Sequence, residues 1–211
     1  MPTERLFVVG AGGHGRVVMD ALLASEAGAG ATFVDDDPAL QGRQMLGRAV
    51  EASAQAFREP GFRFHVAIGA NAVRAAMIER LQREGGRSTS VIHPSARLSS
   101  FCVLGDGVFV AAGAIVGPDA EVGAGTIVNH GAVVDHDCRV GPCSHLAPNA
   151  TLAGGVTVGR RVLVGAGANL LPGITVDDDA VIGAGAVVLA DVPANSSYAG
   201  VPARRLEEKT D

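Results

Sequence analysis

The chain has 211 residues, of which 47% are hydrophobic and 18% charged, a composition that excludes an intrinsically disordered protein. Its net charge of −5 excludes a general nucleic-acid binder, because neutralising phosphates requires clustered Lys and Arg. The sequence contains 29 Gly but only seven Phe, one Tyr and no Trp. The core must therefore be built from Val, Ala, Leu and Ile, which favours thin, regular layers.

The three cysteines form no CxxC pair, so the sequence predicts neither a disulfide framework nor a zinc site. A reducing cytoplasm is the expected location. The apolar run near the N-terminus is too short for a signal peptide, and no run of 18 apolar residues exists. We therefore expect no membrane partner.

Residues 1–90 alternate between strand and helix patterns and predict a small βαβ domain with a parallel sheet. Strands are expected at 6–9, 31–34, 64–68 and 88–92, and helices at 15–26 and from Asn71, as its N-cap, to Arg83. Residues 38–62 indicate a loop and one short helix. Such a domain forms half of a dinucleotide-binding fold.

From residue 92 onward, every sixth residue is Leu, Ile or Val for 17 successive positions. The residue four places later is nearly always small or β-branched. This pattern is typical of a hexapeptide β-helix, in which three six-residue sides make one 18-residue coil. We predict a parallel β-helix of five to six coils over residues 91–193. The N-terminal domain and the tail at 194–211 are expected to cap its ends.

Gly10-Ala11-Gly12-Gly13-His14-Gly15 matches GxGxxG between a predicted strand and a predicted helix, the context that phosphate binding requires. Asp35 ends the next strand, where a carboxylate can bind a ribose hydroxyl. Gly69 follows the third strand on the same sheet edge. A tight turn without a ligand and an NAD site remain alternatives. Because the domain is only half a dinucleotide fold, a mononucleotide or nucleotide sugar fits better than NAD.

His136 follows inward-facing Val134 by two places, so it is predicted at an outward corner of the coil, between Asp135 and Asp137. A neighbouring carboxylate orients an imidazole and raises its basicity, which suits a general base. Gly154 lies one coil further on, where its N–H could stabilise an oxyanion. A solvated corner is the alternative.

The other histidines carry weaker signals. His130 occupies a corner without an adjacent acid, His145 points outward from a flat side, and His65 is expected to be structural. The run Asp177-Asp178-Asp179 is interpreted as a solvated turn, and no metal site is expected.

Several motifs together resemble one family: GAGGHG, VDDD, VAIGAN, HPSA, the hexapeptide run with DHDC and SHLAPNA, and the ending AGVPARRL. This is the sialic-acid/nucleotide-sugar acetyltransferase family, which includes the bacterial UDP-4-amino-sugar N-acetyltransferases. The resemblance implies a left-handed β-helix, a homotrimer, and acetyl-CoA bound in the groove between adjacent helices.

The resemblance also implies roles for individual residues. His136 would be the catalytic base and Asp137 its acidic partner, where the most similar members have Glu. Acetyl-CoA contacts would fall on His145, Gly154, Ala166 and Ala184. Nucleotide-sugar contacts would fall on Gly12, Gly13, His14, Asp35, Asp36 and Gly69.

These observations together predict an acetyl-CoA-dependent N-acetyltransferase of bacterial glycan biosynthesis. Its acceptor would be the amino group of a nucleotide-linked sugar, a UDP-4-amino-4,6-dideoxy sugar in the first instance. Two alternatives stay open at this point: an O-acetyltransferase acting on sialic acid or another sugar hydroxyl, and a non-catalytic β-helix protein that binds nucleotide sugars.

Overall fold

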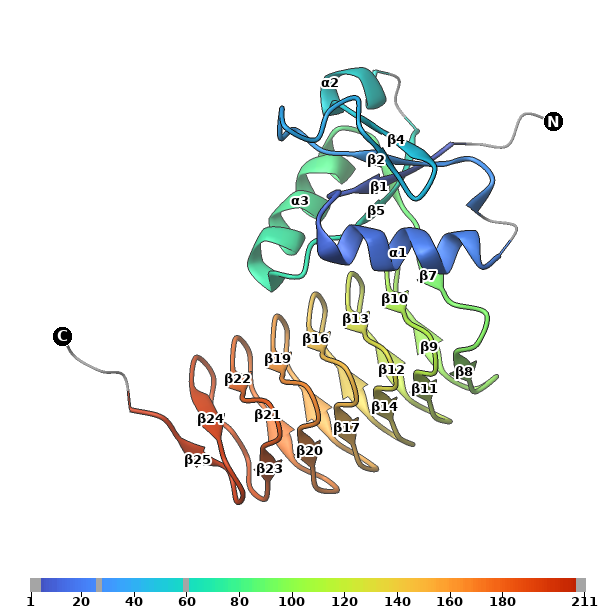
Figure 1. Cartoon of the computed structure of the whole chain (residues 1–211). Coiled ribbons are helices and arrows are strands. Elements are labelled where there is room, and N and C mark those ends of the chain that lie inside the picture. The colour runs from blue at the N-terminus through green and yellow to red at the C-terminus, as the bar shows by residue number, and fades with distance from the viewer. Residues whose placement is uncertain (1–4, 26–27, 59–60, 208–211) are drawn as a thin grey trace.

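The computed structural model describes residues 5–25, 28–58 and 61–207, and it consists of a small α/β domain lying on a long β-helix (Figure 1). The α/β domain has one sheet in the order β3-β4-β2-β1-β5-β6. Its strands are β1 (Leu6–Val9), β2 (Ala31–Val34), β3 (Gln44–Met45), β4 (Arg48–Glu51), β5 (Arg63–Val66) and β6 (Arg87–Ser88). Its helices are α1 (Gly13–Leu23), α2 (Ser53–Ala56) and α3 (Asn71–Arg83).

The predicted parallel sheet is confirmed, with differences in detail. Helix α1 begins two residues earlier than expected and ends at Leu23, and predicted Glu26 lies outside the described residues. The interval 38–62 contains the antiparallel pair β3–β4 as well as a short helix. Asn71 was wrongly predicted as a helix cap: Ala70 is the N-cap of α3, and the Asn71 side chain points to the β-helix instead.

The predicted strand at 88–92 is divided between the two domains. β6 ends at Ser88 in the α/β sheet, whereas Val91 and Ile92 form β7, the first strand of the β-helix. The sequence did not indicate this division, because Thr89 and Ser90 are as compatible with a continuous strand as with a connection between two strands.

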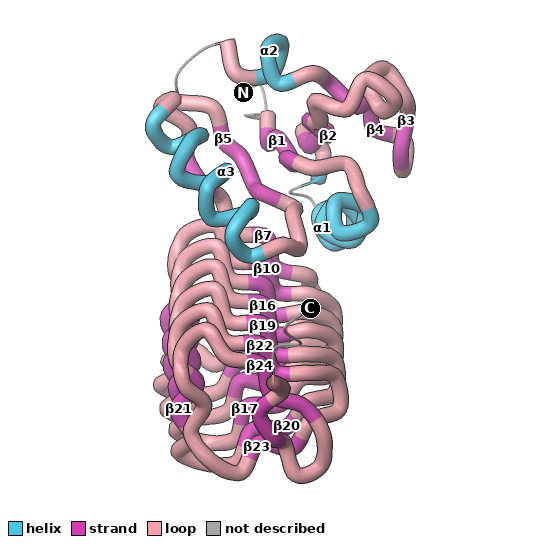
Figure 2. The backbone as a smooth tube through the Cα atoms, turned by 90° about the vertical axis from the view of Figure 1, so that its left-hand side faces the viewer, coloured by secondary structure: helices cyan, strands magenta, loops and turns pink. Residues whose placement is uncertain are grey.

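The β-helix has three sheets that form the faces of a triangular prism, and all their strands are parallel except the final pair β24–β25 (Figure 2). The first face contains β7 (Val91–Ile92), β10 (Phe109–Val110), β13 (Ile127–Val128), β16 (His145–Leu146), β19 (Leu163–Val164), β22 (Val181–Ile182), β24 (Ser197–Ala199) and β25 (Arg204–Arg205). The second face contains β8 (Arg97–Leu98), β11 (Ile115–Val116), β14 (Val133–Val134), β17 (Thr151–Leu152), β20 (Asn169–Leu170) and β23 (Val187–Val188). The third face contains β9 (Val103–Leu104), β12 (Glu121–Val122), β15 (Arg139–Val140), β18 (Thr157–Val158) and β21 (Thr175–Val176).

The six-residue period produces the core of the prism as expected. Paired strands are offset by 18 residues, as in Val110↔Val128 and Val134↔Leu152. From Val110 to Val188 the aliphatic residues of the repeat are buried in one continuous cluster, together with the small residues four places later. Stacking at about 4.8 Å per coil lets each coil cover the backbone of the previous one.

The α/β domain does not cap the end of the prism, so that expectation was wrong. Ile92 remains 42% exposed at the open first coil. The domain instead lies on the side of the prism, where α1 and β1 share a buried cluster with Val91, Phe109 and Ile127 of the first face. At the other end, β24 pairs with β22 and β25 folds back on β24, and Ala203 is buried against the core.

Candidate active site

His136 lies at the edge between the second and third faces, in the corner that joins β14 to β15. Its side chain is 57% exposed, and its Nδ1 is 2.7 Å from Oδ2 of Asp137. This hydrogen bond is the main cause that raises the pKa of His136, and the charge of Asp135 adds to it. Since Nδ1 is bound to the carboxylate, Nε2 is the nitrogen left to exchange a proton with a substrate.

Asp137 adopts a left-handed backbone conformation with φ 59°. The residues one and two coils further on at this place, Gly155 and Gly173, are glycines with positive φ. Asp tolerates this region better than most residues, which explains how an acid can occupy the turn. The turn directs the short Asp137 side chain back to the adjacent imidazole. The hydrogen bond that a Glu would make is therefore formed here by an Asp.

Gly154 lies one coil from His136, and the imidazole ring packs on its bare Cα. A Cβ at position 154 would lie 2.4 Å from both Cε1 and Nε2 of His136, so only glycine leaves room for the ring. The corresponding corner residues of neighbouring coils are Pro118 and Pro172, which have no N–H. The coil therefore does not need the N–H at this position, and that of Gly154 is available to a group bound beside Nε2.

The glycine-rich loop is shaped by close packing. Gly10 has φ 104°, and a Cβ on Gly15 would lie 2.0 Å from the Gly10 carbonyl oxygen. A Cβ on Gly12, Gly13 or Gly69 would meet no atom within 4 Å, so these three glycines border open space. The first and last glycines of the motif are thus explained by packing, and the middle ones leave the backbone open to a ligand.

Asp35 and Asp36 line a cavity of about 180 Å³ at the carboxyl edge of the sheet, together with Gly10, Phe57 and Arg80. Asp35 accepts hydrogen bonds from the backbone N–H groups of Ala11 and Asp37 and so fixes the glycine loop.

Asp36 has a similar task on the other side of the cavity. Its carboxylate accepts from both the backbone N–H and the hydroxyl of Ser53 at the start of α2, which lowers the pKa of Asp36. Both carboxylates therefore stabilise the local fold through hydrogen bonds, besides any contact with a ligand.

His14 and His145, expected to contact different ligands, lie together where α1 meets the first face. Their ring centroids are 6.3 Å apart, and the His14 ring packs edge-on against Phe109. Burial is the main cause that lowers the pKa of His14 to about 3 and that of His145 to about 4. Asn129, which the sequence did not indicate, lies 3.2 Å from Nε2 of His145 through its Nδ2.

Ala166 and Ala184 lie on a different edge from His136 and Gly154. They occupy equivalent corner positions between the first and second faces, one coil apart. The proposed acetyl-CoA residues of one chain are thus distributed over two edges and one face of the prism, and the structure does not gather them in one place within a single chain.

The α/β domain and the His136 edge lie on opposite sides of the prism. The domain lies on the first face (Figure 2). His136 lies between β14 and β15, at the edge between the other two faces. The glycine loop of a chain therefore cannot deliver a small ligand to His136 of the same chain.

Comparisons with known proteins agree with this architecture. The family model for the PglD N-terminal domain matches residues 5–81, and that for six bacterial transferase hexapeptide repeats matches residues 155–190. A variant of perosamine N-acetyltransferase from Caulobacter crescentus, solved with CoA and GDP-perosamine, is 40% identical over 97% of both chains, with a TM-score of 0.90. This chain belongs to the hexapeptide-repeat sugar N-acetyltransferase family.

Two further members of this acetyltransferase family extend the comparison. The acetyltransferase domain of PglB from Neisseria gonorrhoeae, solved with acetyl coenzyme A, is 34% identical over 96% of this chain and 99% of that one, with a TM-score of 0.91. The UDP-N-acetylbacillosamine N-acetyltransferase of Bacillus subtilis is 36% identical over 112 residues, about half the length of that curated relative. The left-handed β-helix expected from the resemblance is thus the fold of this chain.

Within the described ranges, no cluster of three or more His, Cys, Asp or Glu side chains has a geometry suited to a metal ion. Among the same residues, no helix combines the length and apolarity needed to cross a membrane.

Proposed function

We propose that this protein transfers the acetyl group of acetyl-CoA to the amino group of a nucleotide-linked sugar in bacterial glycan biosynthesis. The observation that carries the proposal is the corner in which Asp137 holds Nδ1 of His136 and Gly154 leaves space beside Nε2. The family relationship supports the same reaction, since two of the relatives named above are sugar N-acetyltransferases and two were solved with CoA or acetyl coenzyme A.

The corner supplies each group that the reaction needs. The sugar amine attacks the thioester carbonyl carbon while Nε2 of His136 removes its proton. The Gly154 N–H donates to the oxyanion of the tetrahedral intermediate. Asp137 stabilises the imidazolium through Nδ1–H. When the C–S bond breaks, the CoA thiolate leaves and takes the proton from Nε2, which restores the neutral imidazole.

We assign the nucleotide to the domain of residues 1–90 and acetyl-CoA to the β-helix of residues 91–193, with residues 194–211 as its closing tail. The glycines at 12, 13 and 69 and the cavity lined by Asp35 and Asp36 support a nucleotide site. His14 borders the same loop. The two proposed substrates favour a cytoplasmic location.

We propose a homotrimer: the opposite placement of the two halves of the site supports a site shared between chains, and the family resemblance implies three of them. The amine held by one chain must meet His136 of another chain, and acetyl-CoA then lies between adjacent prisms. His145, Ala166 and Ala184 would line its path on one chain and Gly154 on the next. Sedimentation should give a mass about three times the chain mass of 21.3 kDa. A mass near that of one chain at micromolar concentration contradicts the shared site.

The function is tested by measuring thiol release from acetyl-CoA with a panel of acceptors. A UDP-linked and a GDP-linked 4-amino-4,6-dideoxy sugar should give release together with an N-acetylated product. Matched sugars with a hydroxyl in place of the amine should give none. Release with the hydroxyl sugars alone would show an O-acetyltransferase, and binding of nucleotide sugars without any release would show a binding protein.

A further inference from the structure

The repeated surface of the β-helix poses a problem of register. The α/β domain packs on the first face through apolar contacts of α1 and β1 with Val91, Phe109 and Ile127. Apolar contact is non-directional, so by itself it holds the domain only loosely in place along the prism. A shift by one coil would move the domain by about 4.8 Å. The two-residue link between β6 and β7 restricts such a shift at one end, and polar contacts with particular coils would fix the position of the domain farther along the prism.

Arg74 of α3 is the largest of the fully buried side chains, with 1% exposure, and it lies between the domains. Its guanidinium donates to the carbonyls of Gly125, Cys143 and Ser144 in the β-helix at 2.7, 2.7 and 3.0 Å. On its own side it donates to the carbonyls of Ile68 and Gly69 and to Oδ1 of Asn71. These six hydrogen bonds occupy all five N–H groups, and no carboxylate among the described residues pairs with Arg74. The arginine therefore binds backbone carbonyls and has no donor left for a phosphate.

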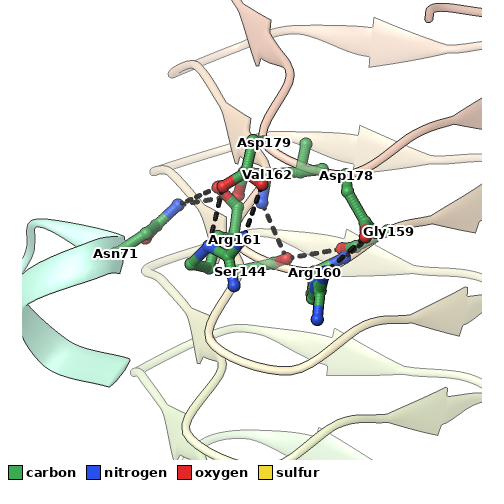
Figure 3. A network of polar contacts seen from close by, with 8 residues as sticks. All are labelled: Asn71, Ser144, Gly159, Arg160, Arg161, Val162, Asp178 and Asp179. Carbon is green, nitrogen blue, oxygen red and sulfur yellow. Dashed lines mark hydrogen bonds and ion pairs between the residues drawn. The ribbon is translucent and has the colours of Figure 1, made fainter. Parts of the chain in front are cut away.

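Asn71 extends the same contact by one coil. Its Nδ2 donates to the carbonyls of Arg161 and Val162 at 2.9 and 3.0 Å (Figure 3). Positions 125, 143 and 161 are 18 residues apart, so Arg74 and Asn71 together bind three successive coils along one edge. We call Arg74 and Asn71 the clamp.

The side chains along this edge make the three coils distinguishable. A Cβ on Gly125 would lie 2.6 Å from Cδ1 of Ile78 in α3, so any larger residue in the first coil would displace the Ile78 side chain. The third has Arg161, which pairs with both carboxylate oxygens of Asp179 on the following coil at 2.7 and 2.5 Å (Figure 3). After a shift by one coil, Ile78 would meet Cys143, and the clamp would face the Arg161–Asp179 pair.

We propose that Arg74, assisted by Asn71, is a positioning residue for acetyl transfer that fixes the nucleotide-binding loop at one height along the β-helix. The role in transfer rests on the proposed function. The guanidinium binds the carbonyl of Gly69, a proposed sugar contact, and the carbonyl of Ser144, the neighbour of His145. It therefore connects the loop that presents the sugar to the strand that faces the acetyl donor.

The test compares Arg74→Gln and Asn71→Ala with Arg83→Gln, an exposed arginine of the same helix, as the matched control. Since a misplacement of about 1 Å can cost about 10²-fold in rate, we expect kcat per folded site to fall about 10²-fold in Arg74→Gln and about tenfold in Asn71→Ala. The Kd for free UDP or GDP, measured by calorimetry, should change much less than kcat, because Arg74 does not itself line the cavity at Asp35 and acts on it only through Ile68 and Gly69. In Arg74→Lys, kcat should remain at least about tenfold below the wild-type value, since an ammonium group cannot reproduce the planar arrangement of guanidinium N–H donors.

An equal loss of kcat and of nucleotide-binding stoichiometry would reveal a purely structural role and overturn the proposal, as would an unchanged kcat. Hydrogen exchange needs no activity and separates this proposal from the proposed function. Residues 67–70 and 143–145 should exchange at least about tenfold faster in Arg74→Gln but not in Arg83→Gln. If the wild-type protein transfers no acetyl group, the proposed function is rejected. Independently of activity, unchanged hydrogen exchange in Arg74→Gln rejects the clamp. Asn71→Ala retains most of the contacts and serves if Arg74→Gln does not fold.

Discussion

The molecule contains two histidine regions with opposite electrostatics. At the exposed edge, Asp137 and Asp135 raise the pKa of His136. The second region lies where the α/β domain meets the first face of the prism. There, burial is the main cause that lowers the pKa of His14 to about 3 and the pKa values of His65 and His145 to about 4. The positive charge of Arg74 lowers each of these pKa values further. The same side chain is thus prepared to accept a proton in one region and kept neutral in the other.

The difference indicates what each region can do. A histidine with a raised pKa and an open Nε2 can exchange protons with a substrate, whereas a buried neutral imidazole offers one fixed donor and one fixed acceptor. We therefore expect the exposed region to carry the proton transfer and the buried region to orient ligands and hold the domains together. Four measurements test this contrast.

The largest effect is expected from His136→Ala. Loss of the general base should lower kcat by about 10²- to 10⁴-fold, with little change in the affinity for acetyl-CoA. Steady-state kinetics and calorimetry measure the two quantities. A loss of less than about fivefold at both pH 7 and pH 9 would mean that the amine arrives already neutral and that the histidine only positions it.

Gly154→Ala should separate catalysis from stability. The new methyl group would collide only with the His136 ring, which can rotate away into solvent. We therefore expect the substitution to leave the stability of the fold unchanged. We expect kcat to fall about 10- to 10²-fold because the ring leaves its position beside Asp137, while the melting temperature stays within about 1 °C. A fall in both quantities would place Gly154 among the structural glycines.

Asp137→Asn should change the pH profile more than the maximal rate. The carboxylate raises the pKa of His136, so removing its charge must lower that pKa. Because the base acts when neutral, the acidic limb of kcat against pH should move to lower pH, and the maximal kcat should fall about tenfold. Asp137→Glu, which keeps the negative charge, is the control and should keep the wild-type direction of the pKa shift. An acidic limb that does not move would exclude the ion pair as the cause.

The smallest effect concerns stability in the buried region. His65 is 1% exposed, and its Nδ1 binds the Thr89 carbonyl at 2.8 Å. Its folded pKa of about 4 lies below the ordinary value of 6.5, so between these values the unfolded chain binds more protons than the folded one. The free energy of unfolding should therefore fall as the pH drops from about 6.5 to 5.5, by roughly 1 kcal/mol per buried histidine.

Urea unfolding across this pH range measures the slope. His65→Asn should reduce it, whatever its effect on the absolute stability. His136→Ala should not reduce it and should make it slightly steeper, because the raised pKa of His136 stabilises the folded protein as the pH falls. A wild-type slope of zero would show that the buried histidines are not held neutral.

The sequence alone determined the features that depend on local or periodic patterns. The six-residue period predicted the coil, its inward residues and the outward corner of His136, because each strand pairs with the equivalent strand 18 residues later. The adjacency of His136 and Asp137 was likewise visible in the chain, and so was the glycine loop between β1 and α1. The nucleotide residues came from the glycine motif together with the resemblance, the acetyl-CoA residues Ala166 and Ala184 came from the resemblance alone, and both sets remain predictions.

Only the tertiary structure decided how the two domains meet. It placed the α/β domain on a face rather than on the end of the prism, divided residues 88–92 between two sheets, and turned His14 towards His145. It also gave Asn71 a partner in the β-helix instead of a helix cap. The contacts responsible join residues far apart in sequence, such as Arg74 with Gly125 and Asn71 with Arg161. Backbone carbonyls are present in every residue, so no side-chain pattern marks the ones that a buried arginine will bind.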